Sequence, residues 1–377
     1  MEIPPPSSRV FSAGSRNAVR YSYSNGLLMS ETDAMNNTIL YGYNDIGQLV
    51  SRKDAENNVT LYEYDAIGNL IKATDANGKS VVNEYDCNNQ KISVTDANGN
   101  KTEYSYNGNM KNDIVTMPDG NTVQYEFDGE DRPVKITDQA GNVTTVTYDP
   151  SGRIVSKRLP DGAVLKYEYD SAGNVVKEIN PLGAATVKTY DKNGNVLSVT
   201  DNEGNITRYQ YNAMSKVTRA VNAVSGATVY SYSSAGDLLS ETDALNNKKT
   251  YTYDIYGNML TSKDARGNIT RYTYDANNNL LTVKDPLNNV TTYTYNSLNQ
   301  LVSVKDARNN VVKYGYDALG RRTTVTDAKN NVFTTVYDAN GNVVKTTDAK
   351  GNTISETVYN SLNLPISVTD AAGKTTS

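Results

Sequence analysis

The chain has 377 residues, a formal net charge of −5 and a pI near 5.1, with its Lys and Arg residues scattered along its length. This charge pattern argues against a nucleic-acid or anionic-membrane surface. Hydrophobic residues make up 37% of the chain and no apolar run reaches membrane-spanning length, so neither a set of ordinary globular domains nor a membrane span is expected. The lack of His and the single Cys, Cys87, exclude His-dependent triads, His metal sites and an intrachain disulfide framework.

The first residues, 1–19, are expected to form an irregular N-terminal segment. They begin with MEIPPPSS, which has neither the basic region nor the apolar stretch of a signal peptide. We therefore expect either that an export signal lies outside this chain or that Met1 is not the natural start.

One pattern then fills residues 20–377, and the chain ends in the middle of it. Its step is 21 residues everywhere between positions 33 and 348. A recurring Asp, most often in Thr-Asp-Ala or Lys-Asp-Ala, stands at Asp33, Asp54, Asp75, Asp96, Asp138, Asp201, Asp243, Asp264, Asp285, Asp306, Asp327 and Asp348. The same phase holds Met117, Leu159, Asn180 and Asn222 in place of Asp. An aromatic series in the same register comprises Tyr43, Tyr64, Tyr85, Tyr106, Phe127, Tyr148, Tyr169, Tyr190, Tyr211, Tyr232, Tyr253, Tyr274, Tyr295, Tyr316 and Tyr337.

Each period contains two four-residue turns, as in 65–69 and 75–79, where the turn is followed by a polar residue. Asp or Asn at the first position can cap the turn through its side chain. The fourth position is Gly, or Asn at Asn36, Asn57, Asn246, Asn288, Asn309 and Asn330, and these residue types best tolerate a positive φ. The order predicts a type I turn followed by a left-handed residue, which is a hairpin loop.

Between the turns lie short alternating segments rich in Val, Thr, Leu and Tyr, which are typical of strands. In 269–274, for example, Thr270, Tyr272 and Tyr274 share one face. The sequence thus predicts an all-β array of about sixteen hairpins of 21 residues. They would form one long coiled antiparallel sheet, a spiral shell or tube. The alternative is a β-solenoid with one 21-residue coil per repeat, in which strands pair in parallel.

Four kinds of candidate site have simpler interpretations. Because the Asp residues recur at equivalent turn positions, we expect them to cap turns rather than to act as a catalytic pair. Residues 96–100 resemble a calcium loop only superficially, since they lack the ligand spacing of known motifs. Cys87, in a turn with no basic partner, is expected to be an exposed thiol, and the Tyr series to pack across strands. We therefore expect no catalytic, cofactor-binding or metal residue, and no cofactor.

The stretch from Tyr251 to Asn268 resembles the YD repeat of the Rhs family, and the same Tyr-x-Tyr-Asp-x-x-Gly-Asn pattern recurs at 62–70 and 167–175. The family includes bacterial polymorphic toxins, the cocoon components of insecticidal toxin complexes, wall-associated proteins and teneurins. The resemblance implies a spiralling β-sheet that closes as a hollow shell. In the toxins the shell holds a variable C-terminal domain, released at an aspartyl self-cleavage segment that is not evident here.

These observations predict a structural wall of a secreted or cell-surface bacterial protein that encloses or presents other material and is not an enzyme. Toxin cargo or neighbouring copies of the chain would be its partners. A glycan- or cell-binding adhesin, which would use exposed Tyr side chains, and a self-assembling extracellular fibre are the alternatives.

Overall fold

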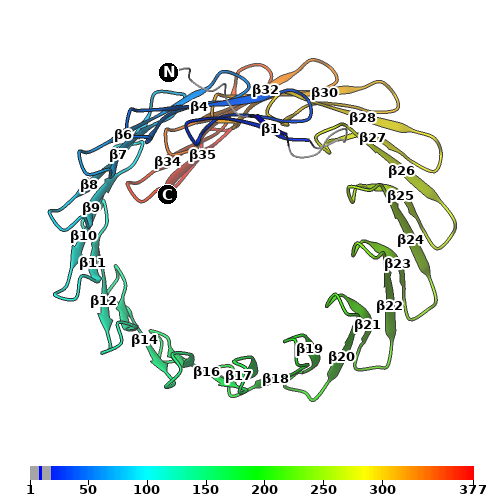
Figure 1. Ribbon diagram of the computed structural model, residues 1–377, viewed down its shortest axis with the longest axis horizontal. Helices are drawn as coiled ribbons and strands as arrows, with labels where there is room; N and C mark the ends of the chain where they lie inside the picture. Colours follow the sequence, from blue (N-terminus) through cyan, green and yellow to red (C-terminus); the bar gives the residue numbers. More distant parts are fainter. Residues whose placement is uncertain (1–7, 11–17) are drawn as a thin grey trace. The chain divides into compact units, whose positions relative to one another are not determined.

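A computed structural model describes residues 8–10 and 18–377, and all the regular secondary structure in these ranges is β-strand (Figure 1). Strands of six and five residues alternate along the chain, because each 21-residue period has two turns that are spaced unequally. None of the described residues forms a helix long and apolar enough to cross a membrane.

The central even-numbered strands have six residues and end on the aromatic series: β4 (Thr38–Tyr43), β6 (Val59–Tyr64), β8 (Ser80–Tyr85), β10 (Lys101–Tyr106), β12 (Thr122–Phe127), β14 (Val143–Tyr148), β16 (Val164–Tyr169), β18 (Ala185–Tyr190), β20 (Ile206–Tyr211), β22 (Ala227–Tyr232), β24 (Lys248–Tyr253), β26 (Ile269–Tyr274), β28 (Val290–Tyr295), β30 (Val311–Tyr316) and β32 (Val332–Tyr337).

The central odd-numbered strands have five residues: β5 (Leu49–Lys53), β7 (Leu70–Thr74), β9 (Lys91–Thr95), β11 (Asn112–Thr116), β13 (Pro133–Thr137), β15 (Ile154–Arg158), β17 (Val175–Ile179), β19 (Val196–Thr200), β21 (Val217–Val221), β23 (Leu238–Thr242), β25 (Met259–Lys263), β27 (Leu280–Lys284), β29 (Leu301–Lys305), β31 (Arg322–Thr326) and β33 (Val343–Thr347). The terminal strands are β1 (Ser8–Val10), β2 (Arg20–Ser24), β3 (Leu27–Thr32), β34 (Thr353–Tyr359), β35 (Pro365–Asp370) and β36 (Thr375–Thr376).

The chain falls into two compact units. Unit 1 contains residues 1–105, 116–120 and 272–377, and unit 2 contains residues 106–115 and 121–271. The irregular segment expected at 1–19 lies mostly outside the described residues, and its described part includes β1, which pairs with β2.

Strand pairing confirms the hairpin array. Within each unit, neighbouring strands of the chain pair antiparallel, as β5 does with β6 (Ser51 opposite Leu61) and β6 with β7 (Leu61 opposite Thr74). The β-solenoid alternative is therefore wrong, because it requires parallel partners one period apart. The physical reason is the tightness of the four-residue turns, each of which reverses the chain completely.

The turns have the predicted geometry. In the turn at 54–57, the Asn57 amide donates to the Asp54 carbonyl (3.0 Å), and Asn57 has a φ of 67°. Asp54 Oδ1 accepts hydrogen bonds from the amides of Glu56 and Asn58 (both 2.9 Å), which confirms the capping role of the first Asp. The fourth position also accepts residues other than Gly and Asn, since Met110, Asp131, Ser215 and Ser225 have positive φ there.

The fourth position offers a direct test of local stability. Ser215 has a φ of 57°, a conformation that costs a side-chain-bearing residue about 1–2 kcal/mol relative to Gly. We expect Ser215→Gly to stabilise the β20–β21 hairpin by about 1 kcal/mol, measured as slower hydrogen exchange of its amides. Gly194→Ala, at φ 81° with no atom closer than 3.6 Å to an added Cβ, should destabilise its own hairpin by a similar amount. Faster exchange in Ser215→Gly would contradict this account.

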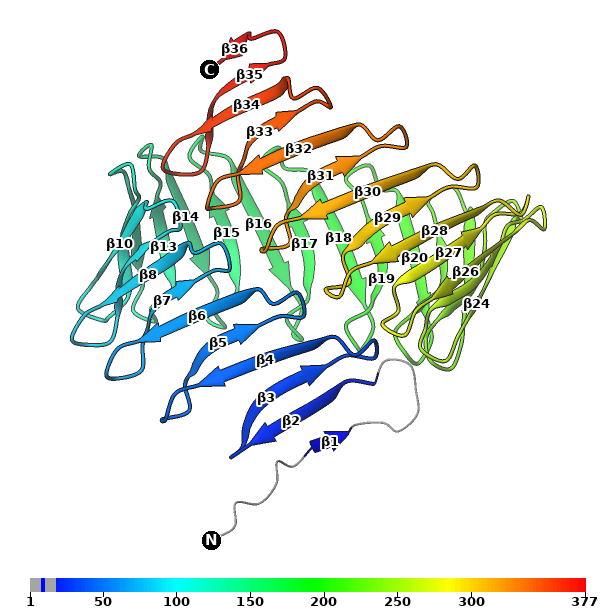
Figure 2. The ribbon, with the colours of Figure 1, turned by 90° about the horizontal axis from the view of Figure 1, so that it is seen from above.

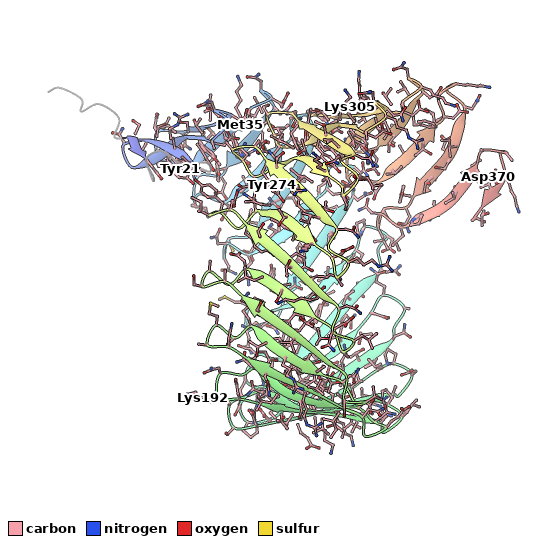
Figure 3. The ribbon with its side chains drawn as sticks, turned by 90° about the vertical axis from the view of Figure 1, so that its right-hand side faces the viewer. Tyr21, Met35, Lys192, Tyr274, Lys305 and Asp370 are labelled. Atoms are coloured by element: carbon pink, nitrogen blue, oxygen red, sulfur yellow. The ribbon has the colours of Figure 1, made fainter. Side chains whose placement is uncertain are left out.

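The sheet is a single layer with side chains on both faces (Figure 3), so burial is shallow. Val146, 7% exposed, is the one buried hydrophobic side chain among the described residues. In β26 the face of Thr270, Tyr272 and Tyr274 is half-buried, whereas Arg271 and Thr273 on the other face are exposed. Side chains of neighbouring hairpins thus cover one face in place of a second layer.

The Tyr hydroxyls connect successive hairpins. Tyr64 Oη, at the end of β6, donates to the carbonyl of Leu49 at the start of β5 (2.9 Å). Burial raises the pKa of the equivalent Tyr211 and Tyr232, so both hydroxyls keep the proton that they donate. The same bond to the residue fifteen positions earlier is made by Tyr43, Tyr85, Tyr148, Tyr169, Tyr190, Tyr211, Tyr232, Tyr295, Tyr316 and Tyr337.

Candidate functional site

The turns lie on two opposite edges of the sheet because alternate turns of an antiparallel array point in opposite directions. We call a turn that follows an odd-numbered strand an odd-strand turn, and one that follows an even-numbered strand an even-strand turn. The odd-strand turn after β5 begins at Asp54, and the even-strand turn after β6 begins at Asp65.

Within unit 1, odd-strand turns of the first segment (residues 18–105) contact even-strand turns of the second segment (residues 272–377). We call this line of contacts the seam. Figure 2 shows β4 and β6 of the first segment beside β28 and β30 of the second. The hydrogen-bonded residues are 240 to 244 positions apart, about eleven and a half periods of 21 residues. The half period explains why an odd-strand turn always meets an even-strand turn.

The seam is clearest where two turns of identical sequence, Asp-Ala-Asn-Gly, meet at 96–99 and 338–341. Asn98 Nδ2 donates to Asp338 Oδ2 (2.9 Å), and Asn340 Nδ2 donates in return to Asp96 Oδ2 (2.7 Å). The Asn98 amide donates to Asn340 Oδ1 (3.2 Å), and the Ala339 amide to Asn98 Oδ1 (3.1 Å). These four bonds form a reciprocal clasp.

The carboxylates of the clasp stay ionised at neutral pH. Burial raises the pKa of Asp96, but hydrogen bonds from Asn100, Asn340 and Asn98 outweigh it, so the pKa lies below its ordinary value. For Asp338 burial likewise opposes the hydrogen bonds from Asn342 and Asn98, and its pKa is again lowered. Both groups are therefore acceptors for amides and are not suited to hold a proton for general acid catalysis.

Two further turn pairs extend the seam. Asn277 Nδ2, in an even-strand turn, donates to Asp33 Oδ2 of an odd-strand turn (2.7 Å). Ser297, in the next even-strand turn, donates through its amide and its hydroxyl to Glu56 Oε1. In each case the second or third position of one turn contacts the first or third position of the facing turn.

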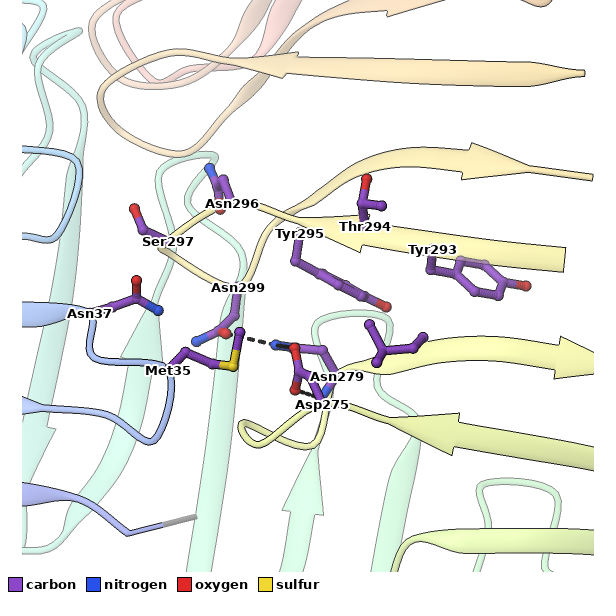
Figure 4. Close-up of a pocket in the computed structure, with 11 residues that line it drawn as sticks. Met35, Asn37, Asp275, Asn279, Tyr293, Thr294, Tyr295, Asn296, Ser297 and Asn299 are labelled. Carbon is purple, nitrogen blue, oxygen red and sulfur yellow. Dashed lines mark hydrogen bonds between the residues drawn. The ribbon is translucent and has the colours of Figure 1, made fainter. Parts of the chain in front are cut away.

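A shallow cavity of about 400 Å³ lies on the seam (Figure 4). Met35 and Asn37 reach it from the first segment, while Asp275, Tyr295 and Asn299 line it from the second. Asn299 Oδ1 accepts hydrogen bonds from Asn277 Nδ2 (2.9 Å) and Asn279 Nδ2 (2.7 Å), which ties two consecutive even-strand turns together. The lining is mostly amide and aromatic. Within it Asn279 donates to Asp275 and Asn299, whereas Tyr295 and Ser297 donate to residues outside the lining.

The fifth residue of the turn has a role that sequence reasoning did not assign. When it is Asn, as in Asn58, its Nδ2 donates to Oδ2 of the first Asp, here Asp54 (3.0 Å). When it is Arg, as in Arg321, its Nε donates to Asp317 Oδ2 (2.7 Å) and its Nη1 to the carbonyl of Asp338 in the next even-strand turn (2.8 Å). The recurrence of Asn after the turn was the signal available in the sequence.

Of the remaining candidates, Cys87 lies apart from the seam and residues 96–100 lie on it. Cys87 is a free, exposed thiol in the turn after β8, as expected. Residues 96–100 form the clasp turn and its closing Asn. Across the described ranges, no group of three or more His, Cys, Asp or Glu side chains could hold a metal ion. The chemistry that the seam offers is hydrogen bonding between turns.

The sequence matches two family models. Residues 62–187, 134–291 and 188–336 match the teneurin YD-shell model in three overlapping stretches. Residues 43–80 and 337–375 match the RHS repeat. No curated protein sequence matches the chain.

Solved structures of Tc toxins are similar in fold. The crystal structure of TcdB2-TccC3 is 17% identical with a TM-score of 0.74, over 96% of this chain and 24% of that one. The crystal structure of the form without the hypervariable C-terminal region is 17% identical with a TM-score of 0.73, over 96% of this chain and 23% of that one. The structure of the Tc holotoxin pore of Photorhabdus luminescens is 16% identical with a TM-score of 0.57, over 94% of this chain and 22% of that one. This chain thus spans about a quarter of those chains, and at these identities the likeness shows the fold alone.

Proposed function

Because the chain belongs to the teneurin YD-shell family, we propose that it is the structural wall of a secreted or cell-surface bacterial protein, and that it encloses another polypeptide. The observation that carries this proposal is the seam. A strip of hairpins one layer thick becomes a continuous wall only where its edges join, and unit 1 joins two distant segments turn to turn.

The nature of the enclosed material is part of the proposal. One of the similar toxin structures was solved without its hypervariable C-terminal region. We infer that a variable polypeptide of this kind is the cargo, held by exclusion of proteases and solvent rather than by a specific pocket. The wall would then act mechanically, with no catalytic residue.

A glycan-binding role has less support from the geometry. It would use the Tyr hydroxyls as polar contacts for sugars. The hydroxyls of Tyr64, Tyr169 and Tyr316 already donate to main-chain carbonyls of the preceding hairpin (2.7–2.9 Å). These side chains serve the sheet itself, which favours the wall.

Protease protection tests the enclosure. An unfolded, protease-sensitive reporter would be fused to the C-terminus of the chain, and its cleavage rate compared with that of the same reporter fused to an unrelated β-protein of similar mass. We expect the reporter to be cleaved at least tenfold more slowly behind the wall. Equal rates in the two fusions would contradict enclosure.

A further inference from the structure

Two edges of unit 1 remain uncovered after the seam has formed. One is the row of odd-strand turns of the second segment, at 285–288, 306–309, 327–330 and 348–351. The other is the row of even-strand turns of the first segment, at 44–47, 65–68 and 86–89. We call them the free odd edge and the free even edge.

Exposure distinguishes the free edges from the seam. The third turn position is 81% exposed at Leu287 on the free odd edge, and 77% and 73% exposed at Ile46 and Ile67 on the free even edge. The same position is half-buried at Leu298, and 49% exposed at Met35, both on the seam. The free edges therefore present large apolar tips that a facing turn covers elsewhere in the same unit.

The two edges are complementary in kind. At the seam an odd-strand edge packs on an even-strand edge, and the third residue of one turn donates to Oδ2 of the first Asp of the other, as Asn98 does to Asp338 and Asn277 to Asp33. The free edges are again one odd and one even, with the same repeat spacing of 21 residues. The turn-to-turn spacing of the seam can therefore be repeated between them.

The edges are also complementary in charge. The third positions of the free odd edge include Arg308, Lys329 and Lys350, all exposed and all longer donors than Asn. On the free even edge the first positions include Asp65 and Asp86. If the free edges pack as the seam does, these cations take the place of Asn98 and the Asp residues take the place of Asp338. Charge-assisted hydrogen bonds of this kind are stronger than those of neutral amides.

We propose that the free odd edge of one copy of this chain binds the free even edge of a second copy, through a repetition of the seam. Because the two surfaces differ, the contact is heterologous, so it adds copies head to tail and forms an open filament unless the rotation between copies closes a ring. This interaction does not depend on whether the wall encloses cargo, and its failure would leave the protease-protection result unaffected.

Sedimentation velocity tests the contact. In 50 mM salt we expect the average mass of the assemblies to rise with protein concentration. In 500 mM salt the association should weaken at least tenfold, because salt screens the exposed Arg, Lys and Asp charges that pair across the contact. The variant R308E/K329E/K350E should remain monomeric at concentrations where the unmodified chain associates. The control R208E/K166E/K313E carries the same charge change on exposed strand positions and should associate at least as well as the unmodified chain. Circular dichroism checks that both variants keep their β-structure.

A mixing experiment tests the direction of assembly. The triple edge variant keeps an intact even edge, so it should cap the unmodified chain and reduce the average mass when added at one part in five. The control variant should not shorten the assemblies. A monomer at every concentration in low salt, association of the edge variant equal to that of the unmodified chain, equal loss in the control, or no capping would each overturn the proposal.

Discussion

Acidification below about pH 4 is expected to loosen the turns that begin with Asp, throughout the array. The first Asp of many turns accepts hydrogen bonds that only its ionised form accepts fully. For Asp264 the Asn268 side chain, followed by the Asn268 amide, lowers the pKa of the carboxyl below its ordinary value of 3.8. The same cause, led by the fifth-position Asn, lowers the pKa of Asp138, Asp170, Asp191, Asp201, Asp243, Asp285, Asp306, Asp327 and Asp348.

The direction of the effect follows from these shifts. A carboxyl whose pKa is lower in the folded state binds protons more readily when the chain is unfolded. Its stabilising contribution is complete above the unfolded pKa and is lost as the pH falls through the folded pKa. Each exposed turn contributes little, but the contributions accumulate along the array because every hairpin relies on its neighbours. The thermal midpoint should be flat from pH 7 to 5 and fall steeply below pH 4.

The chain contains its own control for this experiment. In the turn at 222–225 the first residue is Asn222, whose Oδ1 accepts from the amides of Val224 (3.2 Å) and Gly226 (2.8 Å) without a titrating group. Hydrogen exchange of the 264–268 turn, corrected for intrinsic rates, should speed up on acidification, whereas that of the Asn222 turn should lag behind. In the variant Asp264→Asn, exchange of the 264–268 turn should speed up on acidification as little as that of the Asn222 turn. Simultaneous loosening of both turns at the same pH would refute a role for the carboxylates.

The local structure of the array was predictable because it depends on short segments. The 21-residue step, the Asp cap and the positive φ of residues such as Asn57 follow from steric and hydrogen-bonding rules that act within one turn. The departures at Ser215 and Ser225 were not predictable, since the surrounding turn imposes a conformation that Ser would not choose. The hydroxyl partner of each Tyr was also missed, because it lies on the preceding hairpin.

The seam could not be predicted from the sequence for a different reason. Which turn faces Asp96 depends on the twist and coil accumulated by many strands, and a small change per strand would shift the pairing by a whole turn. Asn98 and Asn340 are ordinary turn residues in the sequence, with the same neighbours as Asn77. Only the fold shows that Asn98 and Asn340 meet across the seam.

Removing both Asn side chains of the clasp is expected to open the seam locally. The double variant N98A/N340A loses all four hydrogen bonds between the turns at 96–99 and 338–341. A hydrogen bond of this kind contributes about 1 kcal/mol, and partial exposure reduces that value. We expect the free energy of local opening to fall by about 2 kcal/mol, and the Ala339 amide, whose acceptor is Asn98 Oδ1, to exchange at least tenfold faster.

The matched control is N77A/N193A, which removes the third-position Asn from the odd-strand turn just before the clasp turn at 96–99 and from one even-strand turn of unit 2. Both control residues are exposed, and their turns keep the Asp caps at Asp75 and Asp191. Hydrogen exchange resolved to peptides covering 96–100 and 338–342 should therefore be unchanged in the control. Because the seam is a row of similar contacts, the clasp variant should also speed exchange in the nearest other hydrogen-bonded turn pair, at 54–57 and 296–299, two periods away. Unchanged exchange at Ala339 in N98A/N340A, or the same acceleration in the control, would show that the clasp does not hold the two segments together.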